Sequence, residues 1–368
     1  MVYFSYYESR TSQFEYSNQF ACDSFIAIFK NLIIRKEGEL AALGYVLVAN
    51  LCISSDKMLS MIYQSDFLQT SFEKFKSGNA NYTELVEAIR FFALLCKGEN
   101  KFSYEQIAKF IKIFDTACRP GEEEETIFYA LGGIVQFIKK NSEHKNQLVM
   151  LLLQLNTVQK ILQCDDEKME TRGRSFVYFA AELVDYIVDA ISPNINPISQ
   201  FIENCNVLTA FNRYLSRPYP HEVKRRIIDV VNKLISLKDL GIIFLFAKNP
   251  IANAFAKLLT NSDFNIITES IKILNLCFAT CNYDILSLLH QQKVIDEIVS
   301  RMKKEKDETN LRSLLECVYF FLQNDGNSFA IYCAKIGLED VLSKQTNFTA
   351  SHFALIEKIR TLMLNKIN

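Results

Sequence analysis

The chain has 368 residues, 49% of them hydrophobic, and its 41 Lys and Arg nearly balance its 42 Asp and Glu, for a formal net charge of −1. This apolar content is typical of a folded protein and too high for a disordered one, and the charge balance predicts no general attraction to nucleic acid or to an anionic membrane. No apolar run approaches the roughly 20 residues that a membrane helix needs, and the N-terminus lacks the basic start and apolar core of a secretory signal.

The first twenty residues are rich in aromatic side chains: Tyr3, Phe4, Tyr6, Tyr7, Phe14, Tyr16 and Phe20. In a repeat protein the terminal units need caps, so this segment is expected to cover the end of the array; the alternative is a tail that binds a partner. We therefore predict an N-terminal tail or cap over residues 1–20 and a single repeat domain over residues 21–368.

Helical periodicity follows and runs through nearly the whole chain. The segment from Phe25 to Ile33 has apolar residues at the i, i+3, i+4 spacing of one helix face. Ser103 and Gln106 form the pattern of a capping box, and the glutamates at 122–125 suit the first turn of a helix, where the helix dipole favours them. Strand-like alternation is almost absent, so the sequence predicts an all-α fold.

Two adjacent glycines, Gly132 and Gly133, fall on one of the predicted long helices. Each glycine in a helix interior costs about 1 kcal/mol relative to alanine. We expect the close approach of a neighbouring helix to explain them, and room for a ligand backbone is the alternative.

Aligning the helical segments by their apolar stripes reveals a repeat of about 44 residues, inside the period of roughly 40–47 residues of HEAT and armadillo units. One column of this alignment is polar in five of its eight positions, although the neighbouring residues are largely apolar. The column consists of Asn50, Leu94, Gln136, Asp185, Asn232, Asn275, Val318 and Ile359.

Between column positions a short, a medium and a long helix follow one another, as at 57–64, 67–75 and 83–97 and again at 283–290, 294–303 and 309–323. This order resembles the armadillo superfamily, most clearly over residues 39–98 and 263–345. The resemblance covers essentially the whole chain and implies a right-handed α-α superhelix, a solenoid of about seven to eight three-helix repeats.

In armadillo proteins the third helix lines a concave groove, where a recurring Asn binds the backbone of an extended peptide. The resemblance implies this role for the column residues Asn50, Gln136, Asp185, Asn232 and Asn275, and it adds Arg90, four residues before the column, to the groove. An amide suits the role because it offers both a donor and an acceptor. The alternative is that these polar groups cap or bridge helices inside the solenoid and contact no ligand.

The chain departs from the importin-α type of armadillo adaptor, which places a Trp four residues before each groove Asn. This sequence has no Trp, so the aromatic walls that would stack a basic side chain are missing. The aromatic N-terminus also lacks the basic autoinhibitory segment of those adaptors. An import-signal receptor is therefore disfavoured.

A basic patch is predicted near the middle of the chain, at Arg174, Lys224, Arg225 and Arg226. It could contact an acidic peptide or a phosphate, or it could be a solvated helix face. The basic surface with interleaved aromatic residues that binds single-stranded nucleic acid is not evident.

Ten cysteines are dispersed along the chain without a Cys-x-x-Cys pair. Cys277 and Cys281 could share a helix face, but no further ligands follow at the spacing of a zinc site, so we expect packed thiols and no metal. This cysteine usage predicts a reducing compartment, the cytoplasm, with the nucleus as a second location.

Catalysis has little support in the sequence. The four histidines lie far apart, and no P-loop, G-x-S-x-G or H-E-x-x-H motif is present. We expect no catalytic residue, no cofactor and no enzyme activity.

The sequence predicts a monomeric, non-catalytic scaffold or adaptor that binds an extended or helical segment of another protein, without nucleic acid or membrane. The alternatives are an importin-α-like nuclear transport adaptor, a regulator of a small GTPase or an actin nucleator, and a structural oligomer joined end to end.

Overall fold

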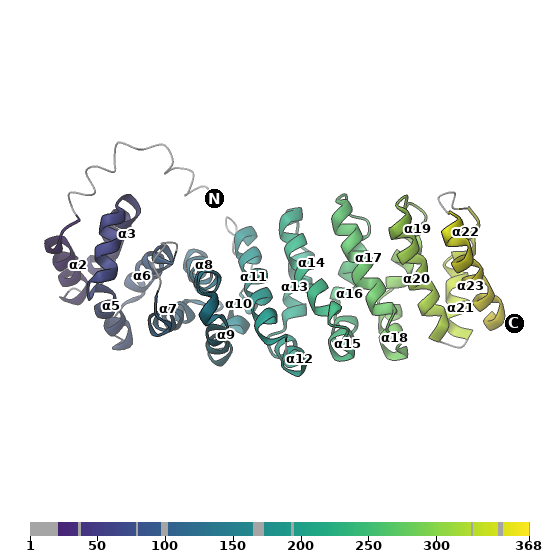
Figure 1. Cartoon of the computed structure of the whole chain (residues 1–368), viewed down its shortest axis with the longest axis horizontal. Helices are drawn as coiled ribbons and strands as arrows, with labels where there is room; N and C mark the ends of the chain where they lie inside the picture. Colours follow the sequence, from purple (N-terminus) through teal and green to yellow (C-terminus); the bar gives the residue numbers. More distant parts are fainter. Residues whose placement is uncertain are drawn as a thin grey trace. The chain divides into compact units, whose positions relative to one another are not determined.

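The computed structural model of the chain describes residues 21–35, 38–78, 80–96, 102–164, 173–192, 195–324, 327–344 and 349–367. Within these ranges the secondary structure consists of helices α2 to α23 and one short 3₁₀-helix, without a strand (Figure 1). The all-α prediction is confirmed. No helix in the described ranges is long and apolar enough to cross a membrane, and the predicted tail or cap at 1–20 lies outside them.

The chain divides into two compact units, Met1–Phe179 and Ala180–Asn368, and the boundary falls within helix α11 (Gly173–Ile191). A single domain over residues 21–368 stays a prediction.

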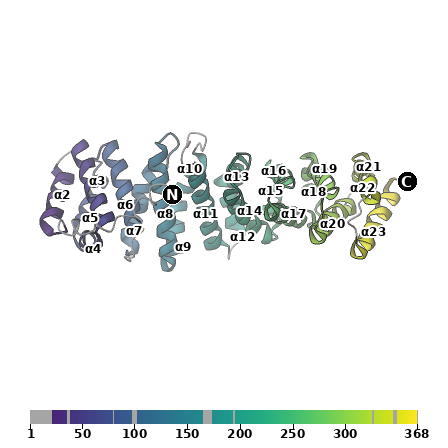
Figure 2. The same cartoon turned by 90° about the horizontal axis from the view of Figure 1, so that it is seen from above.

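Unit 1 begins with a helix pair and continues with a complete short, medium and long triplet at α4, α5 and α6. Its long helices pack in chain order, α3 against α6 and α6 against α8 (Figure 2). Its helices are α2 (Asp23–Arg35), α3 (Glu39–Ser54), α4 (Asp56–Gln64), α5 (Phe67–Lys76), α6 (Tyr82–Leu95), α7 (Tyr104–Ala117), α8 (Glu124–Lys140), α9 (Lys145–Gln154) and α10 (Thr157–Gln163), with the 3₁₀-helix Ser142–His144 before α9.

Unit 2 follows the end of α11 with four consecutive three-helix repeats, and the third helices α14, α17, α20 and α23 pack side by side. The repeats are α12 (Ile195–Asn204), α13 (Val207–Leu215) and α14 (His221–Ser236); α15 (Leu240–Lys248), α16 (Ile251–Leu258) and α17 (Phe264–Phe278); α18 (Tyr283–Gln291), α19 (Val294–Met302) and α20 (Glu308–Asn324); and α21 (Asn327–Lys335), α22 (Leu338–Lys344) and α23 (Ala350–Ile367). These triplets are the armadillo-type units that the resemblance implied.

Local chemistry explains where many helices begin. The capping box at Ser103 and Gln106 is present at the start of α7, and Asn81, Asp239 and Asp263 accept backbone N–H bonds at the starts of α6, α15 and α17. Such caps satisfy amide groups that have no partner within the helix.

Among the described residues, four of the six turns between a first and a second helix use left-handed backbone; the turns before α5 and α16, with Asp66 at φ −81° and Pro250 at φ −54°, do not. Asn156, Asn206 and Lys293 have φ values of 55°, 53° and 59°, and Gly337 takes the corresponding place before α22 with φ 78°. Asn and Gly adopt this conformation at little cost, so the residue type supports the repeat boundary at three of the four turns.

The junction between α19 and α20 is held by a buried carboxylate. Glu305 is 2% exposed, accepts the backbone N–H groups of Lys306 and Asp307 at 2.8 and 2.9 Å, and binds the Arg301 guanidinium at 2.7 Å. Burial alone would raise the pKa of Glu305, but the N–H of Asp307 and the Arg301 guanidinium outweigh it and hold the pKa below its ordinary value.

A stability test follows for Glu305→Gln. Because the folded-state pKa is lowered, the charged Glu305 stabilises the protein above the unfolded pKa of about 4.3, and this contribution is lost as the pH falls through the folded pKa. We expect the variant to be less stable than wild type at pH 7 by about 1.5–3 kcal/mol. The difference should begin to narrow below the unfolded pKa of about 4.3 and should close only as the pH falls through the lower folded pKa. Urea denaturation across this pH range measures the stability difference and its dependence on pH. A difference that does not change with pH would contradict a stabilising role of the Glu305 charge.

Candidate binding surfaces

In unit 2 the predicted column residue Asp185 is an ion-pair partner of the next long helix. Its carboxylate accepts a hydrogen bond from Arg226 Nη2 of α14 at 2.9 Å and pairs with Lys233 of the same helix. Lys233 also pairs with Asp189, 2.6 Å from Nζ to Oδ1. Burial alone would lower the pKa of Lys233, but the two carboxylates raise it above its ordinary value. Asp185 therefore bridges α11 and α14.

The two column asparagines of unit 2 make the same kind of bridge. Asn232 on α14 donates to Glu269 Oε2 on α17 at 2.8 Å. Asn275 on α17 donates to the backbone carbonyl of Ser313 at 2.9 Å and to Glu316 Oε2 at 3.2 Å, both on α20. These contacts support the structural alternative for the polar column in unit 2: each side chain ties one third helix to the next.

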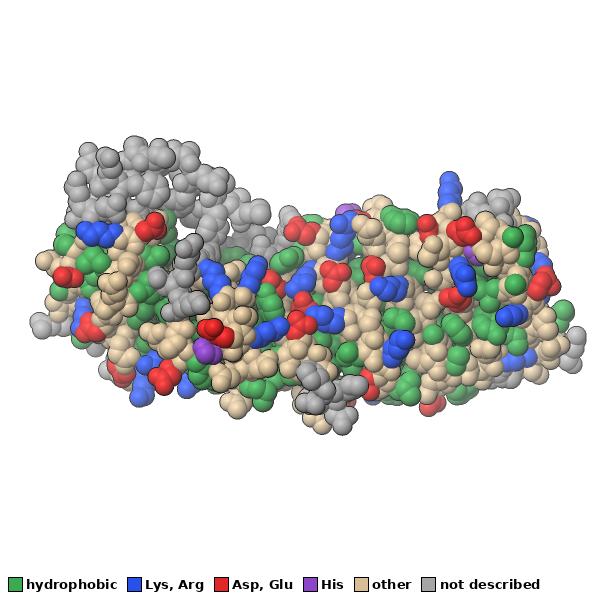
Figure 3. All heavy atoms as spheres, viewed as in Figure 1, with side chains coloured by type: hydrophobic (Ala, Val, Ile, Leu, Met, Phe, Trp, Pro, Cys, Tyr) green, Lys and Arg blue, Asp and Glu red, His purple; other side chains and the backbone are tan. Residues whose placement is uncertain are grey.

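The predicted basic patch consists largely of paired charges. Arg226 binds Asp185, and Arg225 pairs with Asp263, the residue that caps α17. Lys224 is half-buried on α14. Arg174 belongs to the first turn of α11, in the part whose side chains lie outside the description. On the face seen in Figure 3 basic and acidic side chains are interspersed without a large field of one sign.

The last two column positions hold apolar residues that are buried. Val318 and Ile359 are fully buried, whereas the neighbouring Tyr319 is half-exposed. Helix α20 is apolar over more than one face, so its stripe does not fix the register to a single residue.

In unit 1 the predicted groove residue Arg90 bridges α6 and α8. It donates to Glu87 Oε1 of its own helix at 2.7 Å and pairs with Glu125 of α8. Its guanidinium carbon lies 5.6 Å from the ring centroid of Tyr129, within cation–π range. Burial alone would lower the pKa of Arg90, but the two glutamates raise it above its ordinary value.

Beside Arg90 lies a group of half-buried aromatic rings on α8 and on the first half of α11, within unit 1. We call Phe128, Tyr129, Tyr178 and Phe179 the aromatic patch. The Phe128 centroid is 5.7 Å from that of Tyr129 and 5.8 Å from that of Phe179, and Tyr178 and Phe179 are 6.3 Å apart. Each side chain is half-buried, so part of the ring surface of the patch is exposed to solvent.

Gly132 lies one turn after Phe128 and Tyr129 on the same face of α8. Among the described residues, a Cβ at this position would meet one atom, Phe179 Cε2, at 3.8 Å, which is ordinary van der Waals contact. One turn further, the column residue Gln136 is half-buried, and none of the hydrogen bonds of the described residues involves its side chain. Gly132 thus leaves room beside the rings, and Gln136 offers a donor and an acceptor at its edge.

Gly133 has the opposite environment. A Cβ there would lie 2.6 Å from two ring atoms of Phe114 on α7, and Phe114 is fully buried. The predicted close approach of a neighbouring helix is confirmed for Gly133, but it does not explain Gly132, where a Cβ would make an ordinary contact. Room for a ligand backbone stays a prediction for Gly132.

The two glycines should respond to alanine with opposite signs. Gly132→Ala is expected to stabilise the protein by about 0.5–1 kcal/mol, through helix propensity without a clash. Gly133→Ala is expected to destabilise it by about 1–3 kcal/mol, because the methyl group displaces a packed ring. Urea denaturation of the two variants and of wild type measures these changes in the free energy of unfolding. Equal effects of the two substitutions would contradict the different surroundings of Gly132 and Gly133.

The remaining column residue of unit 1, Asn50, is exposed on α3, on the same face as Leu43 and Leu47. Leu94 of α6 is half-buried.

Unit 1 contains a buried polar cluster that was not predicted from the sequence. Lys74 of α5 and Glu84 of α6 form an ion pair at 8% and 0% side-chain exposure, and Lys74 also donates to the backbone carbonyl of Ile33 on α2. Tyr45 lies close by; burial raises its pKa well above the ordinary value, with Glu84 adding to the rise. The cluster is enclosed, so we assign it to the packing of these helices and not to catalysis.

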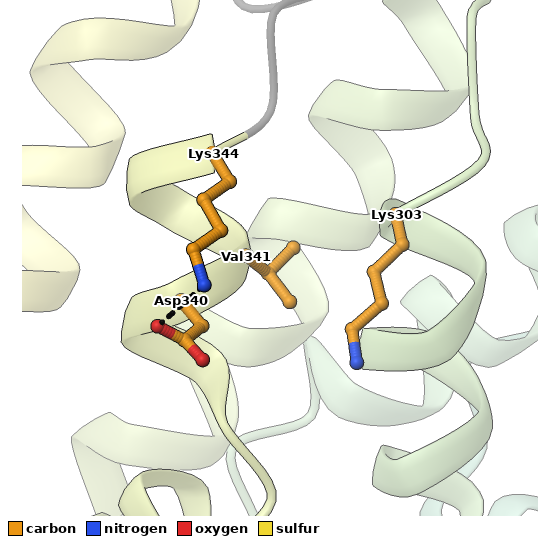
Figure 4. Close-up of a pocket in the computed structure, with 4 residues that line it drawn as sticks. All are labelled: Lys303, Asp340, Val341 and Lys344. Carbon is orange, nitrogen blue, oxygen red and sulfur yellow. Dashed lines mark ion pairs between the residues drawn. The ribbon is translucent and has the colours of Figure 1, made fainter.

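Two surface depressions in unit 2 are lined by few groups that could bind a ligand tightly. One is lined by Lys303, Asp340, Val341 and Lys344 (Figure 4), where Asp340 and Lys344 pair at 3.3 Å with about three quarters of each side chain exposed. The other includes Asn212, Lys248 and Lys257, and both lysines are exposed. Across the described ranges no group of three His, Cys, Asp or Glu side chains could hold a metal ion.

No protein-family model and no curated protein matches the chain. Among solved structures it is similar to a designed armadillo repeat protein in complex with a (KR)4 peptide, at 13% identity over 73% of this chain and 100% of that one, with a TM-score of 0.47. Two engineered proteins match at 13% and 14% identity, covering 71% and 98% of this chain and 96% of theirs, with TM-scores of 0.42 and 0.41. Within each unit, the chain's own three-helix repeats give an all-α fold of the armadillo repeat type.

Proposed function

We propose that the protein is a non-catalytic scaffold or adaptor that binds a segment of a partner protein, with the aromatic patch and Gln136 of unit 1 as the contact surface. The observation that carries this proposal is the glycine at position 132. It costs helix stability, its neighbours would accept a Cβ, and the room it leaves lies between partly open rings and an amide without a hydrogen-bond partner in the described chain.

The chemistry of the surface suits a polypeptide segment. Aromatic rings supply a large apolar contact area with little side-chain entropy to lose, which is why they are enriched at the centres of protein interfaces. An amide such as that of Gln136 can bind peptide N–H and C=O groups whatever the partner's side chains are. The Arg90 network with Glu87 and Glu125 would form a polar rim beside the apolar centre.

Three polar column residues of unit 2, which we call the polar row, are Asp185, Asn232 and Asn275. They fit the role of partner surface less well, because they already hold neighbouring helices together. A transport adaptor of the importin-α type is also less well supported. Two of the positions four residues before the column in unit 2, Ile228 and Ile271, are buried and could not wall a groove. We place the protein in a reducing compartment, the cytoplasm or the nucleus, and expect it to act as a monomer.

The test compares proteins captured from a cell lysate by three forms of the full chain: wild type, Gly132→Leu/Gln136→Ala, and Asn232→Ala/Asn275→Ala. Circular dichroism first establishes that all three fold. We expect a specific partner that the wild type and the unit 2 variant retain and the unit 1 variant loses. Loss of the partner from the unit 2 variant alone would move the binding surface to the polar row, and a partner retained by both variants would exclude both surfaces.

A further inference from the structure

The first two helices of unit 1 carry an unusual amount of exposed aliphatic surface. On α3, Leu40, Leu43 and Leu47 are 50%, 50% and 40% exposed, and their i, i+3, i+7 spacing places them on one face, which we call the leucine stripe. On α2, Ile28 and Ile34 are 51% and 48% exposed. These five are more than a third of the fourteen exposed large hydrophobic side chains among the described residues.

Helix α3 has the sequence of a helix that is covered on all sides. Glu39 is the only charged residue among its sixteen, and the face opposite the leucine stripe is buried, with Tyr45 and Val48 both 0% exposed. Helices that are hydrophobic all round occur in protein interiors, whereas helices at a protein surface carry a polar face. The leucine stripe therefore needs a partner that supplies apolar surface.

The chain itself contains a segment with the required chemistry next to this surface. Residues 1–20 include seven aromatic side chains. They are followed by Ala21, which is buried and lies two residues before the start of α2. Twenty residues span up to about 66–72 Å when extended, against about 24 Å for the sixteen residues of α3. A tethered segment also has a large advantage in effective concentration over a second copy of the chain.

We propose that residues 1–20 dock their aromatic side chains on the leucine stripe of α3 and cover it. This contact is separate from the partner surface proposed for the aromatic patch. Aromatic rings packed on Leu40, Leu43 and Leu47 bury apolar area on both sides, which is favourable in proportion to the area removed from water. The N-terminal segment then covers the exposed apolar face of the first helix pair described in unit 1.

The absence of Trp from the sequence allows a direct test by fluorescence. Leu43→Trp introduces a single reporter in the leucine stripe, and Leu240→Trp, at a leucine that is 53% exposed on α15 of unit 2, is the matched control. In the full chain we expect emission from Trp at 43 to be blue-shifted and poorly quenched by acrylamide. Deletion of residues 1–20 should shift it to the red and increase quenching, with no change for Trp at 240.

Two further experiments test whether the aromatic side chains of residues 1–20 cause the change in emission. A full-length chain with the seven aromatic residues replaced by Ser should show the same red shift without a change in length, and synthetic peptide 1–20 added to the deleted chain should reverse the shift. Emission from Trp at 43 that is unchanged by both the deletion and the Ser replacement would overturn the proposal. A blue shift that appears only as protein concentration rises, together with dimers in light scattering, would also overturn it, because a second copy would then cover the stripe.

Discussion

Replacing Lys74 by Met is expected to destabilise the protein by about 3–5 kcal/mol, the cost of leaving a buried carboxylate without its cation. Glu84 is fully buried, and in the folded protein no water can replace the ammonium group. Lys74 also satisfies the backbone carbonyl of Ile33, so its removal leaves two buried acceptors short of a partner. The midpoint of urea denaturation, followed by far-UV circular dichroism, measures the effect.

The double variant Lys74→Met/Glu84→Leu is the control for this explanation. Two apolar side chains of similar volume remove both charges together, and such replacements are often neutral or stabilising relative to the ion pair. We expect the double variant to recover most of the stability lost by Lys74→Met. A double variant that recovers none of the stability lost by Lys74→Met would contradict this explanation.

Replacing Phe92 by Ala should have an effect of similar size, about 3–5 kcal/mol, because it removes a large side chain from a close-packed interior. Phe92 is fully buried on α6. Its ring centroid lies 5.2 Å from that of Phe110 on α7, 5.8 Å from that of Phe72 on α5 and 6.1 Å from that of Tyr45 on α3. The ring therefore packs between four helices. Phe353→Ala, at a side chain that is 57% exposed on α23, is the matched control, with an expected change within about 0.5 kcal/mol. Equal losses in the two variants would contradict this description of the core.

The repeats of this protein were accessible to sequence reasoning because they depend on local patterns. Apolar periodicity located the triplet α4, α5 and α6 to within a few residues, and the capping box at Ser103 marked the start of α7. These signals lie within one helix or its ends, where propensity and spacing decide the structure.

The partners of the polar column could not be predicted in the same way. Asn275 bonds to Ser313 and Glu316, which are 38 and 41 residues away, and Asn232 bonds to Glu269, 37 residues away. Which side chains meet depends on how adjacent third helices are rotated and shifted against one another. The apolar stripe alone does not fix this rotation and shift.

The aromatic patch did leave a signal in the sequence. The doublets Phe128-Tyr129 and Tyr178-Phe179 both fall about two turns before a column residue, in successive predicted third helices, and Gly132 follows the first of them. The pair of Lys74 and Glu84 left none, since charged residues on a helix are usually solvated and the burial of both depends on how α2, α3, α5 and α6 pack together.

The most direct test of the central claim, that a partner binds at the aromatic patch and not at the polar row, is site-specific photocrosslinking in a cell lysate. A benzophenone amino acid replaces Tyr129 in one form of the full chain and Lys272, an exposed residue of α17 beside Asn275, in another. We predict a discrete crosslinked partner from position 129 that disappears when Gly132→Leu is added, and none from position 272. A partner crosslinked from position 272 alone, or one that Gly132→Leu leaves unchanged, would contradict the account.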